Sequence, residues 1–132
     1  MADYTVIDLS KYRLQRAKED LTAGRNALSN GDFRLGANRA YYAIFHSARA
    51  VLILKGLDYK KHSAVIASFR QNFVKTGIFT SEISKIIGRA FEIRTEADYE
   101  DFFIISKNEV EKQLEDAERF INQMEAYLQE QY

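Results

Sequence analysis

Residues 32–56 read DFRLGANRAYYAIFHSARAVLILKG, and this stretch decides the fold. At 100° per residue on a helix, its apolar side chains fall within an arc of roughly 120°. Asp32 is a favoured residue at a helix N-cap, and Gly56 is a favoured residue just after a helix end. The stretch therefore predicts a core helix from Asp32 to about Lys55, with a buried face made of Ala37, Tyr41, Ile44, Phe45, Ala48, Val51 and Leu52.

The sequence on either side of this helix is also helical in pattern. The chain has no proline, and three of its six glycines, Gly31, Gly56 and Gly77, fall where helices are expected to stop. Such segments cover about residues 10–29 and 61–77, and two more begin at Thr80 or Ser81 and at Ser106. With no internal repeat or linker, we expect an all-α protein: an up-and-down bundle of four to five helices in a single domain over residues 1–132.

The last helix has the clearest apolar stripe. Ser106 and Glu109 have the spacing of a capping box, in which each side chain accepts from the other residue's backbone amide. The stripe is narrow, roughly 80° wide, and suits a second long helix at a shallow crossing angle. That second helix could lie in the same bundle or in a dimer partner. The stripe consists of Val110, Leu114, Ala117, Ile121, Met124 and Leu128.

Composition excludes several classes of protein. The chain has 132 residues, of which 46% are hydrophobic and 29% charged, so a disordered protein is excluded. No segment is long and apolar enough for a membrane span, and we expect a cytoplasmic protein without membrane association. The absence of cysteine excludes disulfides and thiolate metal sites. Because 19 basic residues balance 19 acidic ones, any contact with nucleic acid must use a local patch.

The side of helix 32–55 opposite the apolar arc carries a polar stripe. It contains two arginines, a tyrosine, a histidine and an asparagine. One interpretation is an ordinary helix surface, with arginines lying over packed aromatics and the histidine bonded to a neighbouring helix. The other is an anion site, because guanidinium groups bind phosphate bidentately and tyrosine can stack on a base. The stripe is formed by Asn38, Arg39, Tyr42, His46 and Arg49.

A second candidate region is FEIRTEADYEDF, residues 91–102. Arg94 and Asp98 are four positions apart and would meet on a continuing helix. A surface pair of this kind contributes only about 0.3–0.5 kcal/mol, too little to organise the region by itself. The pair is either a local bundle contact, with Tyr99 as a core aromatic, or part of a binding site.

Nothing in the sequence indicates a metal or another cofactor. His46 and His62 lie sixteen residues apart, without the third ligand or the H-E-x-x-H spacing of a zinc enzyme. The glycines do not form a phosphate-binding loop. Lys61 and His62 stand at a helix start, which is either a solvated entrance or an anion-binding position. We expect no metal ion and no cofactor.

In order and spacing, three segments resemble the HEPN domain family, particularly its small stand-alone prokaryotic members. They are RAYYAIFHSARAVLILKG (39–56), KKHSAVIASFRQNFVKTG (60–77) and RTEADY (94–99), and the resemblance spans roughly residues 10–128. It implies a helical bundle, usually a homodimer, that binds a nucleotide or RNA. It also implies a minimal nucleotidyltransferase partner in a two-gene toxin–antitoxin-like system.

Toxin members of that family resemble metal-independent ribonucleases in which an arginine is followed, four to six residues later, by a histidine. Arg94 matches the arginine, but Tyr99 follows it and no histidine occurs downstream. Metal-free RNA cleavage needs a general base and a general acid, roles that histidine fills well near neutral pH. The resemblance therefore implies a binding module that is not an enzyme.

We expect the ligand site to include Arg39, Tyr42, His46, Arg49, Lys61, His62, Arg94, Asp98 and Tyr99. Two alternatives stay open. One is a ribonuclease toxin in which His46 is the displaced histidine beside Arg94. The other is a structural oligomerisation bundle.

Overall fold

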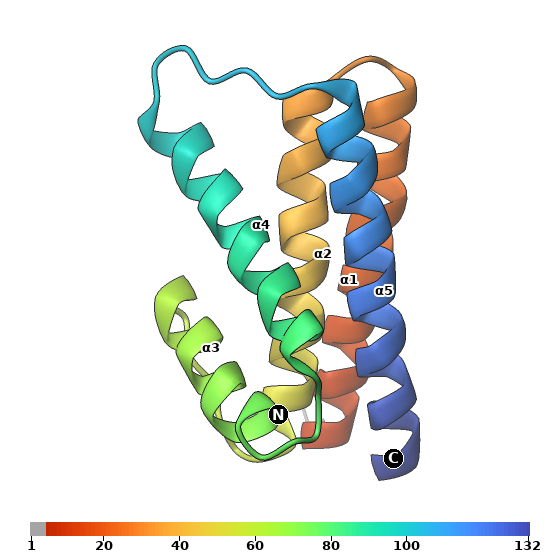
Figure 1. Cartoon of the computed structure of the whole chain (residues 1–132). Helices are drawn as coiled ribbons and strands as arrows, with labels where there is room; N and C mark the ends of the chain where they lie inside the picture. Colours follow the sequence, from red (N-terminus) through yellow and green to blue (C-terminus); the bar gives the residue numbers. More distant parts are fainter. Residues whose placement is uncertain (1–4) are drawn as a thin grey trace.

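The computed structural model describes residues 5–132, and over this range the chain is helical with no strand. The elements are α1 (Val6–Ser29), α2 (Phe33–Ile53), α3 (His62–Phe69), the π-helical segment η1 (Arg70–Val74), α4 (Ser81–Tyr99) and α5 (Lys107–Gln131). Figure 1 shows α1, α2 and α5 running side by side, with α4 inclined along α2 and α3 beside the first half of α4. The expectation of an all-α helical bundle is confirmed.

Helix α2 is the central element and packs against α1, α5, α4 and α3. All seven residues expected on its apolar face are buried. The close approach of α1 and α2 depends on Gly24, where a Cβ atom would lie 2.7 Å from Cδ2 of Leu114 on α5. The small residue thus lets three helices meet at one level of the bundle.

The apolar stripe of α5 is buried inside this same chain. Each of its six expected members is buried, and α5 packs against α2 and α1. The stripe is therefore occupied by the bundle and is not free to form a dimer, so that version of a structural oligomerisation bundle is wrong. Phe120 is also fully buried, although it stands beside the expected stripe.

Most helix ends follow the expected caps. The Asp32 side chain accepts from the backbone N–H of Leu35, and Gly56 and Gly77 have positive φ angles of 74° and 81°. Of the two hydrogen bonds of the expected capping box at α5, only one forms. Ser106 Oγ accepts from the Glu109 N–H, but the Glu109 carboxylate bonds to that hydroxyl and not to the Ser106 backbone amide.

Helix α1 begins four residues earlier than expected. Thr5 and Asp8 form the reciprocal capping box there, so the chain enters the helix at Val6. The helix expected over 61–77 is also different, because it continues as η1 after Phe69. The Lys75 N–H donates to the Arg70 carbonyl, five residues back.

The structure fixes α3 against the rest of the bundle at both of its ends. At the C-terminal end the Arg70 guanidinium, in η1, donates to Ser84 Oγ and Ser84 O on α4. At the N-terminal end His62 stacks on Phe45 of α2. No helix among residues 5–132 is both long enough and apolar enough to cross a membrane.

Candidate functional site

Arg94, on α4, lies over the aromatic rings of α2. Its Cζ atom is 5.3 Å from the ring centroid of Tyr41 and 5.9 Å from that of Tyr42. The Asp98 carboxylate lies 3.7 Å away, on the next turn of the helix. Within residues 5–132 the Arg94 guanidinium makes no hydrogen bond, and the side chain is 27% exposed. It is thus a positioned cation that still has N–H donors for a ligand.

His62 joins the same aromatic cluster from the start of α3. Its ring lies 4.2 Å, centroid to centroid, from Phe45, and Nδ1 is 2.6 Å from the hydroxyl of Tyr41. Burial lowers the pKa of His62, and the positive charges of Arg94 and Arg49 lower it further. Burial also raises the pKa of Tyr41 above its ordinary value, so Tyr41 keeps its proton. A neutral His62 accepts that proton's hydrogen bond at Nδ1 and carries its own proton on Nε2.

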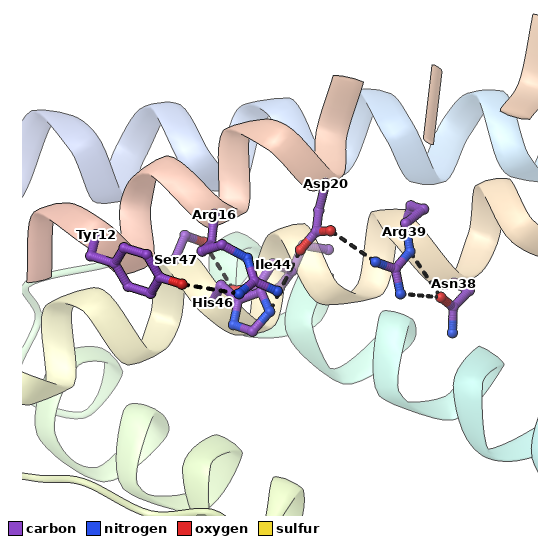
Figure 2. A network of polar contacts seen from close by, with 8 residues as sticks. All are labelled: Tyr12, Arg16, Asp20, Asn38, Arg39, Ile44, His46 and Ser47. Atoms are coloured by element: carbon purple, nitrogen blue, oxygen red, sulfur yellow. Dashed lines mark hydrogen bonds and ion pairs between the residues drawn. The ribbon is translucent and has the colours of Figure 1, made fainter. Parts of the chain in front are cut away.

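A second polar network lies between α1 and α2 (Figure 2). Asp20 of α1 is its centre. Arg39 Nη1 donates to Asp20 Oδ1 at 2.9 Å, and His46 Nε2 lies 3.5 Å from Asp20 Oδ2. Asn38 Oδ1 in turn accepts from Nε and Nη2 of Arg39, at 3.0 and 2.6 Å. Three nitrogen atoms of the Arg39 guanidinium, Nε, Nη1 and Nη2, therefore donate hydrogen bonds within this network.

Burial governs the charges in this network. The Asp20 side chain is only 8% exposed, and burial raises its pKa, although Arg39 opposes that effect. Burial lowers the pKa of His46 to about 4, with four arginines of α1 and α2, Arg16 foremost, acting in the same direction. His46 is therefore neutral near pH 7, and its Nε2 faces Asp20 Oδ2 at 3.5 Å without the geometry of a hydrogen bond, so this buried oxygen has no hydrogen-bond partner among residues 5–132.

Asp58, in the connection between α2 and α3, holds two more arginines. Its Oδ1 accepts from Arg13 Nη2 at 3.1 Å and from Arg49 Nη2 at 2.9 Å. Burial alone would raise the pKa of Asp58, but the hydrogen bonds and charges of Arg49 and Arg13 bring it below its ordinary value. Arg49 also lies over the Phe45 ring, 5.8 Å from its centroid. The Asp58 carboxylate thus links the α2–α3 connection to Arg13 on α1 and to Arg49 on α2.

The structure brings most of the expected site residues together. Arg39, Tyr42 and His46 form one continuous face, on which the Arg39 Cζ lies 5.2 Å from the Tyr42 centroid and the His46 ring 5.8 Å from it. His62 meets the same Tyr42 ring edge to face, at 5.9 Å. Tyr42 is therefore the residue shared by the two networks, because both His46 and Arg94 contact its ring.

Two expected residues do not join the face. Lys61 is exposed and only precedes the first residue of α3. Tyr99 is 84% exposed at the end of α4, so its interpretation as a core aromatic is wrong. The helix ends at this residue, and no neighbouring element covers its ring.

Sequence reasoning missed the partners supplied by α1 and by the α2–α3 connection. Arg13, Arg16 and Asp20 follow one another at steps of three and four, so they form a polar stripe like that of α2. This helical spacing was the feature of the sequence that could have identified the α1 residues. No feature of the sequence indicated Asp58, because a single acidic residue in a polar connection is common.

The site has little enclosed space and no metal-binding cluster. A groove of about 50 Å³ lies between α2 and α4 and is lined in part by Arg34, Asn38, Arg94 and Asp98. Within residues 5–132, no group of three histidine, cysteine, aspartate or glutamate side chains is placed to hold a metal ion. The face suits an anion lying on a surface more than a small molecule in a pocket.

Comparison with known proteins identifies the family. The sequence model described as the HEPN domain matches residues 10–127. The chain belongs to the HEPN domain family. It is similar to a "UPF0332 protein" of Thermotoga maritima, with 35% identity over 120 residues that make up 91% of each chain.

Two further similar proteins are from Methanocaldococcus jannaschii. "Putative toxin MJ0605" is 36% identical, over 89% of this chain and 87% of its own length. "Putative toxin MJ0142" is 31% identical, over 87% of this chain and 78% of its own length. The names of both relatives fit a toxin–antitoxin-like system.

Proposed function

We propose that this HEPN chain is a non-catalytic binding module that holds a phosphate group of a nucleotide or of RNA at Arg94. The carrying observation is the position of the Arg94 guanidinium, which rests on two tyrosine rings and has donors that no described residue takes. A guanidinium fixed in this way loses little freedom on binding, and it matches the oxygens of a phosphate.

The other arginines contribute charge more than direct contacts. Arg39 already donates to Asp20 and Asn38, and Arg49 already donates to Asp58. Their positive charges still lie close to the aromatic cluster that Arg94 contacts, since Arg39 lies over the Tyr42 ring and Arg49 over the Phe45 ring, and they raise the local concentration of an anion. We expect binding to weaken steeply as the salt concentration rises.

The ligand's phosphate, and not its base, is the group that this face fits. The Tyr42 ring is in contact with the guanidiniums of Arg39 and Arg94 and with the rings of Phe45 and His62. A ring surrounded in this way has little free surface for stacking. Phosphate contacts fix a nucleic acid in place without reading its sequence, so we expect little preference among bases.

The proposal includes two protein partners. The names of the two Methanocaldococcus relatives support a place in a toxin–antitoxin-like pair, in which the second protein is a minimal nucleotidyltransferase. We also propose that the module works in the cytoplasm as a homodimer, through a surface other than the buried stripe of α5.

One substitution tests the phosphate site. Arg94→Ala should weaken binding of ATP and of a short single-stranded RNA by at least about tenfold, because a charge-assisted bidentate contact is lost. Adding Arg49→Ala should weaken binding further. Arg94→Lys should retain part of the affinity, since it keeps the charge and loses the fork geometry.

Arg89→Ala is the matched control. Arg89 lies on α4 as well, is exposed, and faces only Glu92, at 3.7 Å. Its removal changes the net charge by the same amount and should leave binding nearly unchanged. Equal titration curves for wild type, Arg94→Ala and the double variant, with folding confirmed by circular dichroism, would refute the site.

A second candidate function is metal-independent RNA cleavage, and the position of His62 favours it. His62 is coupled to Arg94 through Tyr41, whereas His46 faces Asp20 of α1. A ribonuclease of this kind would use His62 as the acid–base group and Arg94 to stabilise phosphate charge. Its histidine would therefore be His62 and not His46.

Cleavage of single-stranded RNA in EDTA decides between the two candidates. The ribonuclease requires cleavage that is lost in His62→Ala and retained in His46→Ala. The binding module requires that nuclease-free protein cleaves none of several RNAs that it binds.

A further inference from the structure

His62 carries one N–H group that no described residue takes. Its Nδ1 atom lies 2.6 Å from the Tyr41 hydroxyl. Burial raises the pKa of Tyr41, so this hydroxyl keeps its proton and Nδ1 accepts the hydrogen bond. The proton of the neutral imidazole is then on Nε2, which makes no hydrogen bond among residues 5–132. The His62 side chain is only partly buried, so this N–H group is open to a molecule from solvent.

Packing also fixes the plane of the His62 ring. The ring lies 4.2 Å from Phe45, centroid to centroid, with the two planes 21° apart, and it meets Tyr42 at 5.9 Å and 89°. One ring face and one nitrogen are therefore held before any ligand arrives. A donor that is positioned in this way loses little freedom on binding.

The Arg94 guanidinium contacts two of the rings that His62 contacts. Its Cζ lies 5.3 Å from the ring centroid of Tyr41 and 5.9 Å from that of Tyr42. The His62 centroid lies 5.6 and 5.9 Å from the same two rings. The charged donors of α4 and the uncharged donor of α3 thus share one aromatic support on α2.

The charges around His62 favour an anion. Burial is the first cause that lowers the pKa of His62. Among the neighbouring charges, those of Arg94 and Arg49 lower this pKa more than the charge of Asp98 raises it. The positive charges therefore outweigh the Asp98 carboxylate at this position, although that carboxylate lies 3.7 Å from Arg94.

We propose that Nε2–H of His62 donates to the same phosphate group that Arg94 binds, and that Tyr41 is the positioning residue that keeps this proton on Nε2. This role rests on the proposed function, to which it adds a second, uncharged donor. Charge-assisted contacts from the guanidinium supply most of the attraction, and the imidazole N–H adds a direction.

The same hydrogen bond makes His62 a donor and not a general base. A general base needs a free lone pair that faces the ligand. In His62 the Nδ1 lone pair faces Tyr41, and Nε2 already carries a proton. A phosphate that lies between His62 and Arg94 is therefore held without a group that could take the proton of a ribose hydroxyl.

Two amide substitutions separate the roles of the two imidazole nitrogens. The side-chain NH₂ of glutamine reaches about as far as Nε2, whereas asparagine is one methylene shorter and reaches only about as far as Nδ1. His62→Gln should keep the dissociation constant of ATP within about threefold of the wild-type value. His62→Asn should raise it by about tenfold, because a hydrogen bond to a charged group is lost. Isothermal titration calorimetry measures both.

Tyr41→Phe tests the positioning role. Without a donor at Nδ1, part of His62 takes the other tautomer, and the dissociation constant of ATP should rise by about two- to fivefold as the competent fraction falls. An amide has no tautomer, so Tyr41→Phe should cost no affinity when it is combined with His62→Gln. In ¹⁵N spectra of the wild type, ATP should shift the Nε2–H signal of His62.

Ser63→Ala is the control, since Ser63 is the next residue of α3 and is exposed. It should leave the dissociation constant unchanged, and circular dichroism checks that every variant is folded. If Arg94→Ala weakens binding and His62→Asn does not, the phosphate site stands and the role of His62 is wrong. Equal losses in His62→Gln and His62→Asn also overturn that role. A loss from Tyr41→Phe that persists in the His62→Gln background overturns the positioning role, and a wild type that binds no ATP overturns the phosphate site as well.

Discussion

The hydroxyl of Tyr41 on α2 lies 2.6 Å from Nδ1 of His62, the first residue of α3. This bond crosses the aromatic cluster under Arg94 and connects the short helix to the centre of the bundle. Since Tyr41 is 1% exposed, water cannot replace the histidine as its partner without a local rearrangement. The contact therefore sets both the tautomer of His62 and the place where α3 begins.

Tyr41→Phe removes this donor and keeps the ring. We expect the free energy of unfolding to fall by about 1–3 kcal/mol, because a half-buried imidazole nitrogen loses its partner. Urea denaturation measures the loss, and ¹⁵N chemical shifts of His62 should show a mixture of tautomers. Tyr99→Phe is the control. Its exposed hydroxyl has no partner among residues 5–132, so its effect should stay within about 0.5 kcal/mol. Equal losses in the two variants would contradict the role of the bond.

The histidines predict how stability depends on pH. The pKa of His46 falls from 6.5 to about 4 on folding, and that of His62 also falls. Between pH 6.5 and 4 the unfolded chain binds protons that the folded chain does not bind. The histidines therefore leave the free energy of unfolding unchanged above pH 6.5 and lower it progressively as the pH falls from 6.5 to 4. His46→Gln should flatten the pH dependence of the urea midpoint between pH 6.5 and 5.

The raised pKa of Asp20 acts in the opposite direction. The folded chain binds a proton at Asp20 more readily than the unfolded chain, so this group favours folding as the pH falls toward 3.8. A stability profile of the wild type that is flat between pH 6.5 and 5 would show that the histidines are not buried as neutral groups.

Asp20→Asn tests the network between α1 and α2. The amide cannot neutralise Arg39, and its NH₂ group competes with the His46 donor, so we expect a loss of about 1.5–3 kcal/mol in the free energy of unfolding. Glu19→Gln makes the same kind of change at the adjacent exposed position and should cost less than about 0.5 kcal/mol. Chemical denaturation compares the two directly. If they prove equally stable, the carboxylate of Asp20 does not organise the two helices.

Two glycines on helices should respond differently to alanine. At Gly24 the new methyl group meets Leu114 at 2.7 Å and Arg39 Cβ at 3.2 Å, both in packed surroundings, so Gly24→Ala should destabilise by about 1–3 kcal/mol. At Gly88 the methyl group meets Nη2 and Cζ of Arg70, the flexible end of a side chain that donates to Ser84. Gly88→Ala should therefore cost less than Gly24→Ala, because the gain of up to about 1 kcal/mol in helix propensity offsets part of the lost contact with Ser84. Thermal midpoints of the pair provide the measurement.

The sequence predicted the fold well because the apolar periodicity of α2 and α5 depends only on local spacing. It did not predict η1, since a π-turn adds one residue per turn and keeps Phe69 and Phe73 both buried, as a regular helix also would. It grouped Arg39, Tyr42, His46 and Arg49 correctly, because they share one helix. It could not predict that Tyr41 and His62 meet, since that contact depends on how the α2–α3 connection folds.

The site also shows where helical spacing misleads. In the ribonuclease alternative His46 was the displaced histidine beside Arg94, yet its Nε2 faces Asp20 of α1, while Arg94 lies over Tyr41 and Tyr42. The crossing of α2 and α4 decides which side chains of α2 face Arg94, and a crossing angle is a property of tertiary packing. Tyr99 was misplaced for a related reason, because α4 ends there and its last turn extends past the side of α2.

Exposed and packed side chains alternate over residues 102–105, where Phe102 and Ile104 are exposed and Phe103 and Ile105 pack against the core. This alternation makes the α4–α5 connection more sensitive to its length than to its composition. Deleting one residue there would shorten the connection, so that Phe103 and Ile105 could not both reach the places that they now occupy against the core. Homologues should therefore keep the number of residues between Tyr99 and Ser106, even where the residues themselves differ.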